Sequence, residues 1–450
     1  MKKPASPPDL DKLMQEMQHQ PEKLMRALQL SGQASSQDYL PWDKIRFKTP
    51  PEGLTHEEWW FGIRMGRTAM RRPLPLFMTD GRSFTYALPD SILRLAEEIS
   101  MRAGGSIASA EQVTNPATRD RYIVTSLIEE AITSSQLEGA ATTRQVAKEM
   151  IRTGRPPRDK SERMILNNYF AMRRVSELRE QSLTPDLICE IHRVVTEGTL
   201  NDPSAAGRIQ SNPDPTDRVA IFSAEDELLH QPPAVEQLPL RMEQLCRFAN
   251  GGEPGDVYLH PVLRALAVHF MVGHDHYFED GNGRTARALF YWVMLKQGYW
   301  LTEFLTISRI LKKAPAKYAR SFMLTEQDGG DLTYFFLYHL EVIVRAINDL
   351  DEYLARKVKE LRETRVFLAS TPGEYNHRQL ALLERALKEP SHSFTAQSHA
   401  LSHNVSTETA RQDLVNLTRR GLLTQERIKR QFVWHPVKNL ADMIRKSQSA

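Results

Sequence analysis

The sequence predicts a mainly α-helical protein with one small β-hairpin in its centre and a separate helical domain at its C-terminal end. Most segments between residues 88 and 350 carry apolar residues at helical spacing. One stretch, 208–233, departs from this pattern, because it is rich in Asp and Pro around residues 219–222, and it favours a short hairpin or extended loop. Residues 374–437 change character again and predict three helices followed by a hairpin.

These patterns divide the chain into four predicted parts. Residues 1–100 form an N-terminal extension, in which 11–30 can form one amphipathic helix and Asp80-Gly81 can form a turn. A helical domain is expected over 101–349, a charged linker helix over 350–373, and the C-terminal domain over 374–450. Within the helical domain and just before it, the expected helices cover 91–102, 122–137, 161–179, 184–197, 235–249, 261–273, 285–296 and 333–346.

Composition excludes several protein classes. A length of 450 residues with 41% hydrophobic residues allows two or three packed domains, and a net charge of +3 points to no particular partner for the whole chain. The two cysteines, Cys189 and Cys246, fit neither a disulfide framework nor a metal knuckle. The polar, Pro-rich start lacks the apolar run of a signal peptide, and no stretch is apolar for long enough to span a bilayer. We therefore expect a cytoplasmic protein without a membrane partner.

The segment 276–287 combines a Gly-rich turn with the start of a helix. His276 follows an apolar helical stretch, and Gly281, Asn282 and Gly283 then permit positive φ angles and a close approach of the backbone. A Gly-rich turn that leads into a helix presents backbone N–H groups to an anion. The imidazole of His276 can accept a proton near neutral pH.

Three charged residues complete this segment. Arg284 and Arg287 lie three positions apart, on one face of the expected helix, where both can donate hydrogen bonds to phosphates. Asp280, just before the turn, offers a hard oxygen ligand of the kind that binds Mg²⁺ together with substrate phosphates. A base, a metal carboxylate, an anion cradle and two arginines are the parts needed for phosphoryl or nucleotidyl transfer.

The segment resembles the Fic family motif, His-x-Phe-x-Asp/Glu-Gly-Asn-Gly-Arg-x-x-Arg, at every defining position. The resemblance extends over about residues 105–345 and implies a Fic-type helical core with a hairpin flap. Upstream, Gly207-Arg208 and residues 218–221 resemble the flap region of the family. One departure is Tyr277, where the family commonly has Pro, and we expect no chemical role at that position.

This resemblance implies an adenylyltransferase that uses ATP as substrate and Mg²⁺ or Mn²⁺ as cofactor. His276 would be the catalytic base that removes the proton from a Ser, Thr or Tyr hydroxyl of a target protein or of the chain itself, and Phe278 would hold the loop in the core. Asp280 would bind the metal, and the attack would release pyrophosphate and leave AMP on the target. The nucleotide phosphates would bind to Gly281, Asn282, Gly283, Arg284 and Arg287, and the target segment would dock by strand addition on Val219, Ala220, Ile221 and Phe222.

A second stretch, 133–139, is interpreted differently when it occurs in one chain with this motif. Ser134 and Glu138 lie one helical turn apart, and Gly139 can end the helix, a pattern that alone is typical of a solvated face. Beside a Fic motif it resembles the family's inhibitory motif, Ser/Thr-x-x-x-Glu-Gly/Asn, in its N-terminal placement. Glu138 would then pair with Arg287 and place a negative charge where a phosphate should bind. Some relatives with this glutamate also remove AMP, so de-AMPylation at the same site stays an alternative.

The C-terminal pattern resembles a winged helix-turn-helix. Residues 406–420 look like its recognition helix, Gly421 like the exit turn, and basic residues follow at Arg419, Arg420, Arg427, Lys429 and Arg430. Such a domain can bind DNA through residues 374–450, or it can serve as a dimerisation or protein-docking unit. Two alternatives therefore stay open: a DNA-binding regulator with a nucleotide-sensing Fic domain, and a homodimer, which is frequent in the family.

Overall fold

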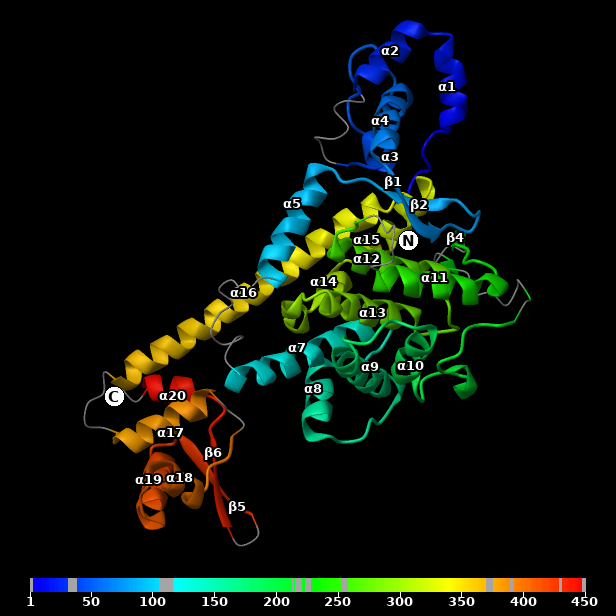
Figure 1. Ribbon diagram of the computed structural model, residues 1–450. Helices are drawn as coiled ribbons and strands as arrows, with labels where there is room; N and C mark the ends of the chain where they lie inside the picture. The colour runs from blue at the N-terminus through cyan, green and yellow to red at the C-terminus, as the bar shows by residue number, and fades with distance from the viewer. Residues whose placement is uncertain are drawn as a thin grey trace. The chain divides into compact units, whose positions relative to one another are not determined.

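A computed structural model of the chain describes residues 3–30, 39–104, 116–212, 214, 221–222, 228–251, 258–369, 375–388, 392–428 and 431–446. The described part is mainly α-helical and contains three two-stranded antiparallel sheets, so the predicted fold class is confirmed (Figure 1). Contacts group the chain into two compact units, Met1–Leu350 and Asp351–Ala450.

The first unit begins with four helices, α1 (Leu10–Gln18), α2 (Pro21–Gln29), α3 (Trp42–Ile45) and α4 (His56–Met70). The single helix expected over 11–30 is wrong, because the chain forms α1 and α2 with a break between them. Pro21 explains the break: proline lacks the N–H that a continuous helix needs, but it is well suited to the first position of a new helix.

A β-hairpin and helix α5 follow. Strands β1 (Arg72–Phe77) and β2 (Ser83–Tyr86) pair across the turn expected at Asp80-Gly81, and Gly81 has the positive φ of +84° that favours glycine. Helix α5 (Asp90–Ile99) continues into one π-helical turn, η2 (Ser100–Gly104). Several aromatic side chains of this region, Trp60, Phe61, Phe84 and Tyr86 among them, are buried in its core.

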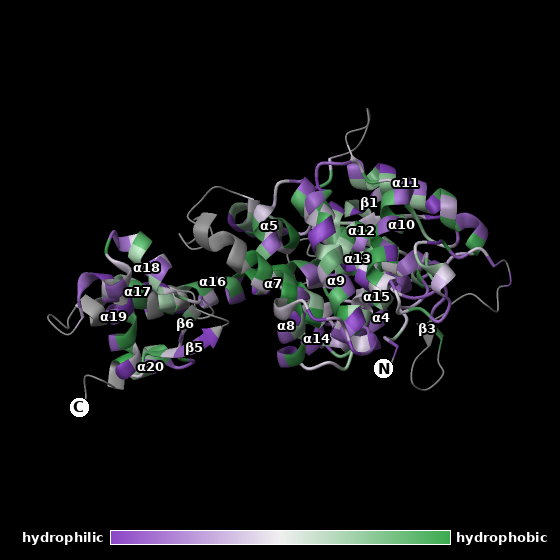
Figure 2. Cartoon of the chain, turned by 90° about the horizontal axis from the view of Figure 1, so that it is seen from below, coloured by the Kyte–Doolittle hydropathy of each residue, from purple (hydrophilic) through white to green (hydrophobic). Residues whose placement is uncertain are grey.

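The centre of the first unit is built around α12 (Pro261–Asp275) and α13 (Asn282–Lys296). All side chains from Arg284 to Leu295 are buried, which is the property of a helix surrounded by other helices. Hydrophobic residues gather on these central helices and on α7, while polar residues face outward (Figure 2). The surrounding elements are α7 (Pro116–Leu137), α8 (Arg144–Thr153), α9 (Lys160–Glu177), α10 (Pro185–Thr196), η3 (Pro203–Ala205), η4 (Val235–Gln237), α11 (Leu238–Asn250), η5 (Trp300–Phe304), α14 (Ile307–Lys313) and α15 (Pro315–Gln327).

The hairpin expected within 208–233 is present. Strands β3 (Ile221–Phe222) and β4 (Leu228–His230) are antiparallel, with Ile221 opposite His230 and Phe222 opposite Leu228. Of the four predicted docking residues, Ile221 and Phe222 form β3, whereas Val219 and Ala220 lie outside the described residues.

Helix α16 (Thr333–Ala369) is one continuous helix. Two helices, 333–346 and a linker helix over 350–373, were expected here, and the break between them is wrong. Ile347 and Leu350 are buried and continue the apolar stripe, and the intervening residues include no proline or glycine that would end a helix.

The second unit has the expected order of elements. It contains α17 (His377–Lys388), α18 (Ala396–His403), α19 (Thr407–Arg419) and the hairpin of β5 (Leu423–Ile428) with β6 (Gln431–Pro436). A further helix, α20 (Leu440–Lys446), was not expected. Leu383, Leu414 and Trp434 belong to one apolar core that joins these elements. The assignment as a winged helix stays a prediction.

Two sequence-level expectations concern cysteine chemistry and membranes. Cys246 is buried, Cys189 is partly buried, and both are free thiols. Burial raises the pKa of Cys246 to about 12, which makes its thiol unreactive at neutral pH. Among the helices that the structure describes, none combines the length and the apolar character needed to cross a bilayer.

Candidate functional site

The motif loop joins the end of α12 to the start of α13, and two residues with positive φ make this connection. His276 follows the last residue of α12 with φ 50° and ψ 58°, and Gly281 precedes α13 with φ 84°. His276 Nδ1 lies 3.2 Å from the carbonyl oxygen of Gly273. Because a carbonyl only accepts hydrogen bonds, Nδ1 carries a proton, and Nε2 is the basic nitrogen of the neutral ring.

Asn282 closes the loop with its side chain. Its Oδ1 accepts a hydrogen bond from the Phe278 backbone N–H at 3.0 Å, and its Nδ2 donates to the Phe278 carbonyl at 2.6 Å. The Phe278 side chain is fully buried in the core. The side chain of Asn282 therefore stabilises the loop. Its backbone N–H, at the start of α13, is the group that can bind an anion.

His192 on α10 contacts the motif loop. The sequence interpretation did not include this residue. Its Nδ1 accepts a hydrogen bond from Gly207 N at 2.9 Å, so its Nε2 carries the proton and donates to the Asp280 carbonyl at 2.8 Å. The ring stacks on Phe278 with centroids 3.7 Å apart. Burial lowers the pKa of His192 to about 4, which keeps the ring neutral.

Gln210 holds the same loop from the other side. Its backbone N–H donates to the Tyr277 carbonyl at 2.9 Å, and its side-chain Nε2 donates to the carbonyls of Phe278 at 2.7 Å and His276 at 3.2 Å. Gln210 belongs to the segment that leads toward β3. The chain that carries the hairpin is thus hydrogen-bonded directly to the motif loop. Nothing in the local sequence marks His192 or Gln210, because both act on residues far away along the chain.

Arg284 and Arg287 share a helix face but have different surroundings. Arg284 is fully buried, and its Nη1 donates to the Val195 carbonyl at 3.0 Å. Its Nη2 lies 3.8 Å from the carboxylate of Asp280, whose side chain is 53% exposed. Burial lowers the pKa of Arg284 from its usual value. Arg284 thus forms the floor of the site, while Asp280 stands at its solvent edge.

Arg287 is held by the end of α7. Its Nε donates to Ser134 Oγ at 2.8 Å, and its Nη2 donates to the Ser134 carbonyl at 3.0 Å. The same Nη2 forms the expected ion pair with Glu138 Oε1 at 2.8 Å. The Arg287 side chain is 3% exposed and that of Glu138 is 29% exposed, so this pair is largely shielded from water.

The Glu138 carboxylate lies directly over the first turn of α13. A Cβ atom on Gly283 would be 2.2 Å from Glu138 Oε1, closer than any side chain allows. The N-cap residue Gly281 has no side chain to cap α13, and its own N–H donates to Asp280 Oδ1 at 2.6 Å. The positive end of the helix therefore faces the Glu138 carboxylate. Glu138 therefore occupies the place that the sequence assigns to nucleotide phosphates. Gly139, next to it, has a φ of +91° and lies two residues after the end of α7.

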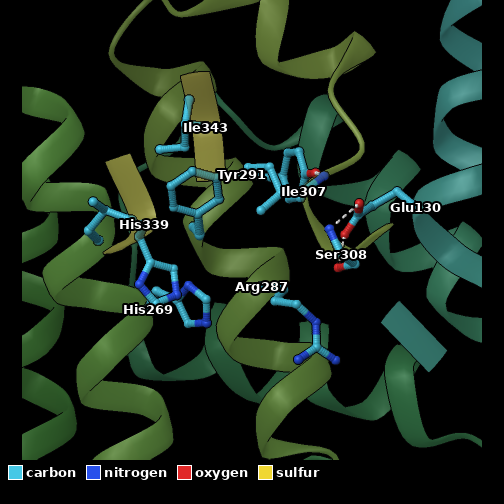
Figure 3. A pocket seen from close by; sticks show the side chains of 10 residues that line it. Glu130, His269, Arg287, Tyr291, Ile307, Ser308, His339 and Ile343 are labelled. Carbon is cyan, nitrogen blue, oxygen red and sulfur yellow. Dashed lines mark hydrogen bonds between the residues drawn. The ribbon is translucent and has the colours of Figure 1, made fainter. Parts of the chain in front are cut away.

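A small cavity of about 10 Å³ lies behind Arg287, roughly the space that one water molecule needs. Figure 3 shows Arg287 at the edge of this region, with His269 and His339 on one side and Glu130 and Ser308 on the other. Glu130 accepts a hydrogen bond from Ser308 N at 3.0 Å, and its burial raises its pKa. Glu130 and Ser134 on α7 and Glu138 just after its end are spaced by four residues, and this stripe could have been noticed in the sequence.

Tyr277 is part of a buried polar cluster at the end of α12. Its hydroxyl donates to Asp275 Oδ2 at 2.7 Å, and Arg241 Nη2 and His274 Nδ1 lie 2.7 and 3.0 Å from Asp275 Oδ1. The departure from the family motif at this position therefore has a structural role: Tyr277 ties the loop to Asp275.

A cavity of about 360 Å³ opens beside the motif loop. It is lined by Arg208, Gln210, Asn212 and Glu279, among others. It lies where the segment leading toward β3 meets the motif loop.

Comparisons with known proteins agree with this arrangement. Residues 182–294 match the model of the Fic/DOC family. The chain is 33% identical over 121 residues to the "Protein adenylyltransferase Fic" of Nematostella vectensis, covering 27% of this chain and 25% of that protein. It is 31% identical over 137 residues to the protein of the same name from Drosophila melanogaster, covering 30% of this chain and 25% of that protein.

The alignments thus span about a quarter of the length of these relatives. A crystal structure of a Fic family protein from Desulfovibrio desulfuricans G20 superimposes with a TM-score of 0.50 and 19% identity, covering 79% of this chain and 98% of that one. At that identity the match concerns the fold alone. Residues 182–294, which include α10–α12, most of α13 and the motif loop, are thus similar to the Fic/DOC family, and the fold is similar to that of a Fic family protein.

Proposed function

We propose that this chain transfers AMP from ATP to a Ser, Thr or Tyr hydroxyl of a target protein, itself included. The observation that carries the proposal is the start of α13, where Arg287 lies beside Gly283, and the loop leading into this start carries His276 with a basic Nε2. The match of this region to the Fic/DOC family, and relatives named protein adenylyltransferases, support the same activity.

Each residue of the loop has a different role in the proposed reaction. Backbone N–H groups of Asn282 and Gly283 receive the phosphates, because the N-cap residue Gly281 has no side chain to occupy them. The N–H of Gly281, also assigned to the phosphates from the sequence, donates to Asp280 Oδ1 at 2.6 Å in the resting loop. Arg287, and Arg284 from the floor, balance the negative charge. His276 Nε2 takes the proton of the target hydroxyl, whose oxygen then bonds to the α-phosphorus while the bond to pyrophosphate breaks.

Asp280 is the residue proposed to hold Mg²⁺ or Mn²⁺. Its carboxylate is exposed at the rim of the anion site, and one carboxylate together with phosphate oxygens is a donor set that fits Mg²⁺. When bound, the ion would neutralise charge on the phosphates. Arg284, 3.8 Å away, keeps the carboxylate at this edge of the loop.

The target segment is proposed to dock on the β3–β4 hairpin by strand addition, which needs main-chain hydrogen bonds and little sequence specificity. Gln210 supports this role, because it ties the segment leading into the hairpin to the carbonyls of the motif loop. The docking residues proposed from the sequence are Val219, Ala220, Ile221 and Phe222.

We further propose that Glu138 restrains this activity. Its carboxylate pairs with Arg287 and stands over Gly283, so the γ-phosphate of ATP would meet a like charge and would lose its arginine. Ser134 contributes by holding Arg287 through two hydrogen bonds in this resting position.

Labelling with ATP that carries the label on its α-phosphate tests both proposals. Glu138→Gly should incorporate label into itself or into a lysate protein, and mass spectrometry should find an added AMP. The control Glu138→Gly combined with His276→Ala should incorporate none. Absence of label from Glu138→Gly would contradict the transfer, and equal labelling of Glu138→Gly and wild type would contradict the restraint.

De-AMPylation at the same site is the second candidate. It is favoured by the position of Glu138, whose partly exposed carboxylate reaches the phosphate site and could orient a water molecule there. Wild-type protein should then release AMP from a target that Glu138→Gly has modified. Glu138→Gln should be unable to do so.

The C-terminal unit is proposed to bind duplex DNA through α19. Thr407, Arg411, Gln412 and Arg419 are exposed on this helix, which suits a recognition helix. Of the basic wing residues, Lys429 and Arg430 lie outside the described residues. Binding of the full chain to duplex DNA should weaken steeply with salt and should be reduced by Arg411→Ala. Dimer formation, also expected from the family resemblance, can be measured by light scattering.

A further inference from the structure

Three potential metal ligands meet at a place outside the motif loop. His230 comes from β4, His274 from the last turn of α12 and Glu326 from α15. One ligand atom of each lies within 4.8 Å of the other two. Both histidines are buried and Glu326 is partly buried.

The second nitrogen of each histidine is already oriented by an acceptor. His230 Nε2 donates to the His274 carbonyl at 2.7 Å, which leaves Nδ1 facing Glu326. His274 Nδ1 donates at 3.0 Å to Asp275, a carboxylate that also receives a hydrogen bond from Arg241. His274 Nε2 is then the nitrogen able to bind a metal. Histidines that ligate metals almost always have their other N–H fixed in this way by a carbonyl or a carboxylate.

We propose that His230, His274 and Glu326 form a binding site for a divalent transition-metal ion, best suited to Zn²⁺, separate from Asp280. Two imidazoles and one carboxylate are a ligand set that Zn²⁺ favours, and water would take the fourth position. Asp275 would support the site through His274 without touching the ion.

The present geometry shows what binding has to change. His230 Nδ1 lies 2.8 Å from Glu326 Oε1, a hydrogen-bond distance, so this nitrogen now carries a proton. Ligand atoms of a tetrahedral zinc ion lie roughly 3.3 Å apart, given bonds of about 2.0–2.1 Å. The ion would therefore replace that proton, separate His230 from Glu326 slightly, and draw His274 inward from its present distance.

The position of this site gives the ion a structural effect on the candidate active site. His274 lies two residues before His276, and His230 belongs to the strand paired with β3. A metal bound here would tie the hairpin to the end of α12. If the hairpin docks the target, which rests on the proposed function, the ion would fix the docking strand relative to the catalytic histidine.

Cobalt binding to the full-length chain tests the site, with Co²⁺ as a coloured substitute for Zn²⁺. Metal-free wild type should bind one Co²⁺ per chain and should show the visible absorption of a tetrahedral nitrogen–oxygen site. His230→Gln and the nearly isosteric Glu326→Gln should lose this absorption and bind Co²⁺ at least about tenfold more weakly. Asp280→Ala is the matched control, because it removes the carboxylate of the other proposed metal site, and its absorption should equal that of wild type.

Lack of the absorption in wild type, or its persistence in both ligand variants, would overturn the proposal. Thermal unfolding of wild type gives a second measurement that needs no variant: Co²⁺ or Zn²⁺ should raise the melting temperature and a chelator should reverse this. An unchanged melting temperature would count equally against the site. Since neither readout involves nucleotide, a chain that binds the ion but transfers no AMP would contradict the proposed function alone.

Discussion

Helices α13 and α19 begin in opposite ways. At the start of α19, Ser406 Oγ accepts a hydrogen bond from the Thr409 backbone N–H at 3.1 Å, so the helix satisfies its own first turn. α13 starts after Gly281, which has no side chain to cap the first turn, although its N–H donates to Asp280 Oδ1 at 2.6 Å. The carboxylate of Glu138, from the residue that follows α7, lies over the first turn in place of a cap.

This difference separates a helix start that stabilises the fold from one that is available to a ligand. Uncapped N–H groups at a partly buried helix end attract an anion, and here the chain supplies one itself. The exposed start of α19 offers no comparable anion site, because its own serine occupies the donor. If Glu138 moves away, the first turn of α13 becomes open to a phosphate, whereas the first turn of α19 stays capped.

The largest expected effect concerns the residue that begins α13. Gly281→Ala places a side chain at a φ of +84° and sets its Cβ 2.6 Å from Thr196 Cγ2, so we expect a loss of about 3 kcal/mol in the free energy of unfolding. Gly298→Ala is the matched control, because Gly298 has a φ of +83° with nothing within 4 Å of the added Cβ. It should lose only about 1 kcal/mol, the cost of the backbone conformation alone. Urea denaturation measures both, and equal losses would contradict the role of the close packing.

A smaller effect is expected below the loop. His192→Phe preserves a ring that can stack on Phe278 but removes the hydrogen bonds to Gly207 and Asp280, and we expect a loss of about 2 kcal/mol in stability. As a positioning residue, His192 should affect kcat of AMP transfer in the Glu138→Gly background more than KM for ATP. If stability falls while kcat is unchanged, His192 has a structural role only and does not position the catalytic loop.

The effect of the negative charge of Glu138 on the start of α13 can be separated from the effect of its side-chain volume. Glu138→Gln keeps a side chain over Gly283 but removes the negative charge, so AMP incorporation should rise about tenfold, equivalent to ~1.4 kcal/mol, and less than in Glu138→Gly. Initial rates with α-labelled ATP measure this. Identical rates for Glu138→Gln and wild type would show that the side chain restrains the site by its volume and not by its charge.

The smallest effect is expected at α19. Ser406→Ala removes the cap and should destabilise the helix by about 1 kcal/mol, while AMP incorporation by the Glu138→Gly background stays unchanged. Hydrogen exchange of the first α19 amides should become faster by roughly fivefold, as that free energy implies. A change in AMP incorporation would instead indicate that the second unit influences the first.

The sequence by itself determined the features that depend on neighbours along the chain. The spacing of Arg284 and Arg287, the Gly-rich turn before a helix, and the Ser134–Glu138 pair follow from the 3.6-residue repeat and from the conformational freedom of glycine. The helical fold class and the central hairpin could be predicted in the same way. The break at Pro21 and the unbroken course of α16, which has neither proline nor glycine between residues 346 and 350, both carried local signals that were missed.

Only the tertiary structure decided which distant residues share the site. Packing brings Ser134 to Arg287 across 153 residues and His192 to Asp280 across 88 residues. Packing also places Arg284 at the buried base of the site and Arg287 beside Glu138, although both arginines lie on one helix face. Such contacts depend on how whole helices pack, since a side chain's partner across the core is set by helix position and orientation. The local repeat specifies only which side chains face the same way.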